Sequence, residues 1–192
     1  MPRSPGLMVK VFGVCIVLLA ISVTGCATQP VPILLRYGST VSYLGAPYPG
    51  TPYHEGVDIE GAVGDDVLAV ADSVVLIAGL GAGDAARCGI GVLTRLKRAE
   101  GESYSDVRKV RYCHLSAVTV TMGGELKRGD RLGLLGDTGN AGPRPHIHYE
   151  IRTTDGSTED PLKLTVGCFD PTVNYPTDRV VFTYPVKCTS KR

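Results

Sequence analysis

The sequence predicts an all-β domain, built mainly from antiparallel sheets of short strands. Runs of β-branched and other apolar residues, each only a few residues long, recur along the chain. Twenty-four glycines and 13 prolines break these runs at close intervals. From residue 36 to 192 no segment has the apolar period of an amphipathic helix of three turns. Together these features are typical of an all-β fold without substantial helices.

The first 25 residues predict an export signal that is not part of the fold. Arg3 and Lys10 make the start of the chain positive. Residues 11–23 form an apolar run of about thirteen residues, which suits a signal peptide and is short for a membrane span. The run ends in Gly25-Cys26, which resembles the lipobox of bacterial lipoproteins, in which the cysteine carries the lipid. The alternative is an ordinary signal peptide with a chance cysteine.

Removing this leader leaves about 167 of the 192 residues, enough for one domain with its own core. We expect a tether over residues 26–35 and a single domain over residues 36–192. Loss of Arg3 and Lys10 takes the formal net charge from +1 to −1. A chain without a basic surplus has no general attraction for a polyanion, so we expect no nucleic-acid binding.

The strands are expected in short succession. Residues 36–53 are rich in Gly, Pro and Tyr and predict a loop with room for one strand. A hairpin is predicted from residues 91–96 and 109–115, joined by a charged loop over 97–108. The other predicted strands span residues 66–71, 73–78, 118–120, 146–151 and 179–184, with further short ones among the glycine turns of 123–139.

Four cysteines remain after the leader and Cys26 are set aside. In an exported domain they predict two disulfides, for which three connectivities exist. We favour Cys88 with Cys113 and Cys168 with Cys188, because each pair is close in sequence and the first flanks the predicted hairpin. No C-x-x-C spacing occurs, so a zinc finger is not expected.

The predicted strand at residues 146–151 carries three titratable side chains close together. At the two-residue period of a strand, His146, His148 and Glu150 share one face, while three apolar residues share the other. Histidines one strand repeat apart lie roughly 6.6–7 Å apart at their Cα atoms, close enough to converge on one ion. In the earlier strand, the same alternation places His114 with Tyr112. It therefore predicts that Cys113 points away from His114, together with Arg111 and Leu115.

A further pair, His54 and Asp58, precedes these strands. Nearby glycines disfavour a helix, and a fully extended strand would separate the two Cα atoms by roughly 13 Å. A bend at Gly56 would bring the two side chains together. With His114, His146 and His148 they supply four imidazoles and one carboxylate, the ligand types expected of zinc. The residues alone do not decide whether His146 or His148 is a ligand.

Three motifs in order carry a family resemblance. His54-x-x-x-Asp58, then Tyr112-x-His114, then His146-x-His148 resemble the motifs of the lysostaphin-type (LytM-like) zinc metallopeptidases, which cut peptidoglycan. Glycine-containing segments at residues 64–69, 127–133 and 136–139 also resemble that family. The match covers about residues 54–152 and implies the lysostaphin-like β fold.

The resemblance implies that His54, Asp58 and His148 hold one Zn²⁺ ion per chain, and that His114 and His146 line the reaction centre. In the implied mechanism a zinc-activated water attacks the scissile carbonyl of a peptide cross-link. One of the two histidines acts as general base, and the other stabilises the oxyanion or protonates the leaving amine. Which of the two histidines has which role stays open.

Glu150 is expected to accept an N–H from an imidazole and fix its tautomer, with an ordinary exposed carboxylate as the alternative. Before the strand, Gly142-Pro143-Arg144-Pro145 is longer by two residues than is usual in the family, which predicts that Arg144 lies near the substrate. A lipid on Cys26, followed by Ala27 rather than aspartate, predicts an outer-membrane anchor facing the periplasm.

Two other functions compete with the peptidase. The first is a catalytically silent relative that binds peptidoglycan or activates another hydrolase, which is disfavoured because all five metal and catalytic positions are filled. The second is a periplasmic metal-binding protein or another metalloenzyme on the same fold. A regulatory protein partner, and a covering role for residues 36–53, are left open by the sequence.

Overall fold

The structure is a computed structural model that describes residues 31–48, 51–97 and 108–188. The predicted leader, the lipidation residue Cys26 and most of the charged loop at 97–108 lie outside the described residues. No helix within these three described ranges is long and apolar enough to cross a membrane.

Short strands make up almost all of the regular structure, as the sequence predicts. The helical elements of the described chain are one turn of α-helix and one 3₁₀ turn, η2. In chain order the elements are β1 (Ile33–Leu35), β2 (Val57–Glu60), β3 (Asp66–Leu68), β4 (Ser73–Leu80), α1 (Ala85–Cys88), β5 (Ile90–Leu96), β6 (Lys109–Val118), β7 (Glu125–Leu126), β8 (Arg131–Leu135), β9 (His146–Arg152), β10 (Thr158–Glu159) and η2 (Pro161–Lys163).

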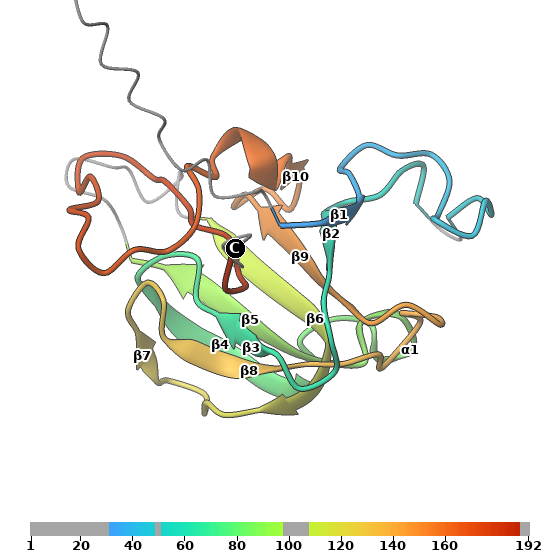
Figure 1. Cartoon of the computed structure of the whole chain (residues 1–192), viewed down its shortest axis with the longest axis horizontal. Coiled ribbons are helices and arrows are strands. Elements are labelled where there is room, and N and C mark those ends of the chain that lie inside the picture. The colour runs from blue at the N-terminus through green and yellow to red at the C-terminus, as the bar shows by residue number, and fades with distance from the viewer. Residues whose placement is uncertain (1–30, 49–50, 98–107, 189–192) are drawn as a thin grey trace, which may run out of the picture.

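Every ladder between the named strands is antiparallel, and the strands join into one sheet in the order β1-β2-β9-β6-β5-β4-β7 (Figure 1). Strand β10 adds to β9, while β8 pairs with both β3 and the end of β6. The predicted hairpin is confirmed as the β5–β6 ladder. Strand β9 lies between β2 and β6, so the H-x-H motif is flanked on both sides by other strands.

The alternation predicted for β9 is confirmed. Its apolar residues Ile147, Tyr149 and Ile151 are fully buried in the main hydrophobic cluster. They pack there with aromatic and aliphatic side chains of the neighbouring strands, among them Val57, Ile59, Tyr112, Leu115, Leu132 and Leu135. Because successive strand residues point to opposite faces, this anchoring fixes the direction of the histidines between them.

Both expected disulfides are present. Cys88 pairs with Cys113 and ties α1 to β6, and Cys168 pairs with Cys188 in the C-terminal segment. Each bridge closes a loop in the unfolded chain and so lowers its conformational entropy.

The predicted start of the folded domain and the last predicted strand are both wrong. The segment expected to end the tether contains β1, which pairs with β2, and Val31 before it is buried in the core. The folded part of the chain therefore includes residues 31–35. The predicted strand at 179–184 is also not formed: this segment makes an isolated bridge from Phe182 to Thr165. The β-branched run there predicted a strand, but the segment instead makes separate backbone hydrogen bonds to residues 164–167 and to Val70 around the buried Phe182.

Phe182 tests how far the C-terminal segment belongs to the core. Its side chain is fully buried in the main cluster. We expect Phe182→Ala to lower the free energy of unfolding by about 3–5 kcal/mol, because it removes buried apolar surface and leaves a cavity. Urea denaturation followed by circular dichroism measures this.

Val173→Ala is the matched control, because Val173 lies in the same segment and is 49% exposed. Its free energy of unfolding should change by less than about 0.5 kcal/mol. Equal effects of the two substitutions would contradict the assignment of Phe182 to the core.

Candidate metal centre

The candidate site lies where β2 and β6 flank β9. In the β2–β9 ladder Asp58 is directly opposite His148, and in the β6–β9 ladder Cys113 is opposite His148. Directly opposed residues of an antiparallel pair have Cβ atoms about 4.5–5.5 Å apart. The register alone therefore brings Asp58 and the region of His114 to either side of His148.

Three side-chain atoms converge on one point. Nε2 of His54 lies 2.9 Å from Nδ1 of His148 and 3.1 Å from Oδ1 of Asp58, and the last two atoms are 2.9 Å apart. Ligand atoms about 2.0–2.1 Å from a tetrahedral zinc lie roughly 3.3 Å from one another. The spacing and the donor types of this group therefore fit a zinc ion.

The orientation of the two rings supports the same fit. Nδ1 of His54 donates to the carbonyl oxygen of Arg36 at 3.1 Å, which leaves Nε2 with its lone pair. Nε2 of His148 faces the Glu150 carboxylate at 3.6 Å, so in the neutral ring the proton is favoured on that nitrogen and the lone pair on Nδ1. When a cation replaces the proton on Nδ1 of His148, the lone pairs of both rings can converge with Oδ1 of Asp58 on that cation.

The predicted bend at Gly56 is present, and it brings His54 back to Asp58. Gly56 also lies directly against β9. A Cβ atom at this position would stand 2.6 Å from the carbonyl oxygen of Tyr149 and 2.7 Å from Cε1 of His148. Glycine is required here by the close approach of the His148 ring.

The electrostatics of the group favour a cation. Burial alone would raise the pKa of Asp58, but hydrogen bonds and charge interactions with His148 and His54 lower it well below its usual range. Burial lowers the pKa of His148, whereas Asp58 and Glu150 raise it to about 9 in the metal-free protein. Two carboxylates that attract a proton to this ring also attract a metal ion.

His114 and His146 stand together beside the metal-ligand group, with ring centroids 4.7 Å apart. Nδ1 of His114 donates to the Thr138 carbonyl, and Nδ1 of His146 donates to the Arg144 carbonyl, both at 2.8 Å. Burial lowers the pKa of His146 and, with the neighbouring His148 and His146, lowers that of His114 to about 3. Both rings are therefore neutral near pH 7 in the metal-free protein.

The predicted face of Cys113 is wrong. Arg111, Cys113 and His114 all line the cavity, whereas Tyr112 and Leu115 are buried in the core. The reason is local: His114 has a φ of 66°, and the ladder between β5 and β6 shifts register there. The left-handed backbone at His114 breaks the two-residue alternation, so consecutive residues Cys113 and His114 face the same side.

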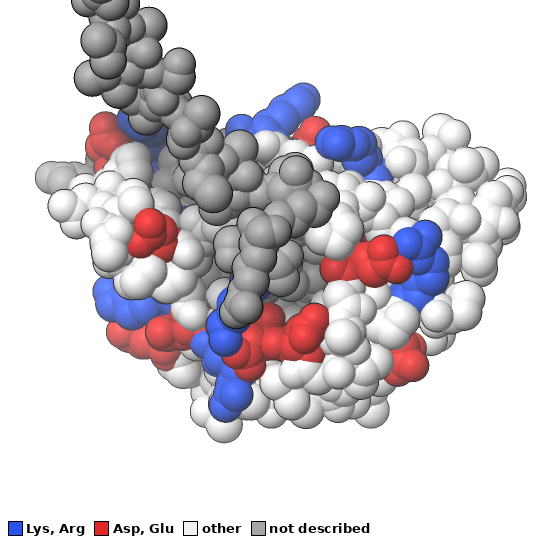
Figure 2. Space-filling model, viewed as in Figure 1, with Lys and Arg blue, Asp and Glu red and all other residues white. Residues whose placement is uncertain are grey.

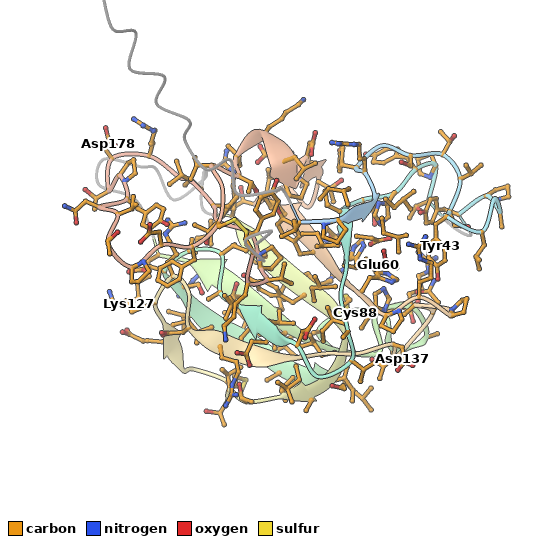
Figure 3. All side chains as sticks on the ribbon, viewed as in Figure 1. Tyr43, Glu60, Cys88, Lys127, Asp137 and Asp178 are labelled. Atoms are coloured by element: carbon orange, nitrogen blue, oxygen red, sulfur yellow. A yellow bond between two sulfur atoms is a disulfide. The ribbon has the colours of Figure 1, made fainter. Side chains whose placement is uncertain are left out.

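All of the predicted metal and catalytic residues open onto one cavity of about 380 Å³. Its lining residues are Ser42, Tyr43, Tyr48, Thr51, Tyr53, His54, Glu55, Asp58, Asp84, Arg87, Cys88, Arg111, Cys113, His114, Asn140, His146, His148, Glu150 and Arg152. Figure 3 shows Tyr43 and Cys88 at the same end of the molecule, while Lys127 and Asp178 lie at the other.

Two tyrosines of the early loop contact this site. The ring of Tyr48 stacks on His54 with centroids 5.4 Å apart, and Tyr43 meets His146 edge-on at 5.9 Å. The Tyr43 hydroxyl donates to the carbonyl of Ala141. Neither tyrosine belongs to one of the three motifs, and the tyrosine-rich composition of residues 36–53 is the only signal in the sequence that points to them. Residues 37–48 include no charged side chain, and Figure 2 shows the upper right of the molecule, where they lie, as uncharged surface.

Arg144 does not lie where it was expected. It forms a two-point ion pair with Glu60, at 2.8 Å and 2.7 Å, and is absent from the lining of the cavity. The longer loop thus brings the Arg144 backbone to His146 while its side chain is held by β2. Glu150 is buried with its carboxylate near His148, and is not an exposed strand residue.

Gly56→Ala tests the packing of the metal group. The added methyl group would displace the His148 ring, so we expect metal affinity to fall on the order of tenfold. Competition between the protein and a fluorescent zinc chelator measures the affinity.

Gly79→Ala is the matched control, since Gly79 has a positive φ of 101° but its added Cβ would meet no atom within 4 Å. It should destabilise the protein through backbone strain and leave metal affinity unchanged. The same loss of affinity in both variants would contradict the steric role of Gly56.

Comparisons with known proteins agree with this geometry. An uncharacterized metalloprotease of Haemophilus influenzae is 37% identical over 111 residues, which is 58% of this chain and 21% of that protein. The peptidoglycan DD-endopeptidase ShyA of Vibrio cholerae is 31% identical over 102 residues, which is 51% of this chain and 20% of ShyA. The chain thus spans about a fifth of the length of these curated relatives.

Solved structures share the fold. The catalytic domain of the antimicrobial peptidase lysostaphin from Staphylococcus simulans superposes with a TM-score of 0.55 at 24% identity, covering 69% of this chain and 90% of that domain. A zinc containing peptidase from Vibrio cholerae gives 0.52 at 22% identity, covering 69% of this chain and 38% of that one. Residues 52–161, which hold the three motifs and β9, match peptidase family M23. The chain belongs to peptidase family M23.

Proposed function

We propose that this protein is a zinc-dependent endopeptidase that hydrolyses peptide cross-links of bacterial peptidoglycan. The observation that carries the proposal is the meeting, in one cavity, of three converging ligand atoms and two neutral histidine rings. The chain's membership of peptidase family M23 supports a peptide as substrate. Its similarity to a Vibrio cholerae protein named as a peptidoglycan endopeptidase supports the cell wall as its source.

In this proposal His54, Asp58 and His148 hold the zinc ion. Zinc in such a site supplies polarisation of the scissile carbonyl and a water of lowered pKa. His114 and His146 then handle the protons at Nε2, because each ring donates its Nδ1–H to a backbone carbonyl. Nε2 of His146 also lies 3.6 Å from Oδ2 of Asp58. One of them takes the proton of the attacking water on Nε2; the other stabilises the developing oxyanion or protonates the leaving amine in the form that carries a proton on its Nε2.

The site of action follows from the same proposal. Peptidoglycan lies in the cell envelope, and we place the protein there through a lipid on Cys26 in the outer membrane, facing the periplasm. The bridges Cys88–Cys113 and Cys168–Cys188 suit an oxidising compartment.

Separate substitutions on β9 test the division of roles. Removing His146 leaves the three metal ligands in place, so His146→Ala should bind zinc stoichiometrically and lose at least about 100-fold in rate. His148→Ala removes a ligand, so both zinc and activity should be lost. Metal analysis and mass spectrometry of digested, cross-linked muropeptides measure the two properties.

Chelation supplies the control for the wild-type chain. A strong chelator should abolish muropeptide cleavage, and added Zn²⁺ should restore it. Cleavage that persists in both His148→Ala and the chelated protein would overturn the enzyme assignment. Stoichiometric zinc without any cleavage of defined muropeptides would favour a metal-binding relative.

Lipidation has its own test. Metabolic labelling with a palmitate analogue should mark the wild-type protein, and Cys26→Ser should abolish the label. Fractionation should place the labelled protein in the outer membrane. Cys15→Ser is the control, because Cys15 lies within the predicted leader and its loss should leave labelling intact. Labelling that survives Cys26→Ser would contradict the proposed anchor.

A further inference from the structure

A chain of ion pairs lies on one wall of the cavity, behind the metal ligand His148. Glu150 is its centre: it is 2% exposed, and its carboxylate is bound by two arginines. Arg111, directly opposite Glu150 in the β6–β9 register, reaches it with Nη1 at 3.3 Å. Arg152, two residues further along β9 on the same face, donates from Nε to the other carboxylate oxygen.

The network connects two of the metal ligands. Nη2 of Arg152 lies 3.4 Å from Oε2 of Glu55, the residue that directly follows His54. Glu150 in turn faces Nε2 of His148 at 3.6 Å. Arg152 therefore holds together the two carboxylates that neighbour His54 and His148, although these ligands come from segments more than 90 residues apart.

The position of Arg111 is itself constrained. Its Nε donates to the carbonyl of Ala82 at 3.0 Å, so the guanidinium cannot turn freely toward the cavity. The side chains of Arg111 and Arg152 are 21% and 27% exposed, and both are engaged with carboxylates. A buried carboxylate needs such partners, because an unpaired one is strongly destabilised.

We propose that Arg111 and Arg152 are positioning residues for the metal centre, which act through Glu150. They hold its carboxylate against the Nε2 side of His148, so that the ring stays oriented with Nδ1 toward Asp58 and His54. The inference rests on the zinc site of the proposed function. It assigns to the two arginines a role in metal affinity and not in substrate binding.

Charge-removing variants test this role. Arg111→Met and Arg152→Met keep most of the side-chain length but leave Glu150 with one cationic partner fewer. Each should lower zinc affinity about 10-fold to 100-fold, as loss of partners behind a metal ligand does in other sites. Competition with a chelator of known affinity measures this directly, and activity should recover when zinc is raised to saturation.

Two further variants supply a control and a rescue. Arg131→Met removes an arginine that pairs with Asp66 at 3.4 Å and does not line the cavity, so zinc affinity should stay unchanged. Arg152→Lys retains a positive charge near Glu150 and should restore at least half of the lost binding free energy. The lysine variant also serves if the methionine variant does not fold, as judged by circular dichroism of the apo-protein.

A double-substitution cycle decides whether the arginines act through Glu150. Glu150→Gln should itself weaken zinc binding, and adding Arg152→Met to it should cause no further loss. Unchanged zinc affinity in both methionine variants, or a raised KM with normal zinc affinity, would overturn the inference. So would additive losses in the double variant. Because zinc affinity is measured without substrate, a wild-type protein that cleaves no muropeptide would refute the proposed function and leave this test intact.

Discussion

The register of β9 between β2 and β6 is the constraint on which the site depends. It places Asp58 on one side of His148 and the His114 region on the other. A shift by one residue would send the histidines into the core and the apolar residues into the cavity. The burial of Ile147, Tyr149 and Ile151 opposes such a shift, so the packing of the core and the geometry of the metal group are maintained by the same strand.

Carbonyl and carboxylate partners then decide what each imidazole can do. Backbone carbonyls take the Nδ1–H of His54, His114 and His146, which leaves Nε2 of each ring available. His148 differs because its Nδ1 faces Asp58 instead of a backbone carbonyl, and Glu150 stands at its Nε2. The four histidines have the same side chain, and their different surroundings are the basis for the proposed division into metal ligands and proton carriers.

Elements outside the three motifs support this arrangement. The Cys88–Cys113 bridge ties α1 to β6 at the residue before His114. Thr138, which carries the carbonyl partner of His114, also donates from its hydroxyl to the Leu115 carbonyl and accepts from the backbone of Ile90. The positive φ of His114 is thus held between a disulfide and a hydrogen-bonded turn. Such a strained residue persists where the surroundings determine its conformation.

The sequence by itself determined the all-β class, the hairpin and the alternation of β9, because these depend on local periodicity and short separations along the chain. It favoured the two disulfide pairs that form, but left the other connectivities open. It also indicated that the chain bends at Gly56. It further indicated that the four histidines and Asp58 belong to one site. Only the tertiary structure decided that Cys113 and His114 face the same side, that Arg144 turns to Glu60, and that Tyr43 and Tyr48 reach the cavity. It also decided that Arg111 and Arg152 meet at Glu150. These features depend on a register shift and on contacts between distant segments, and such contacts leave no periodic trace in the sequence.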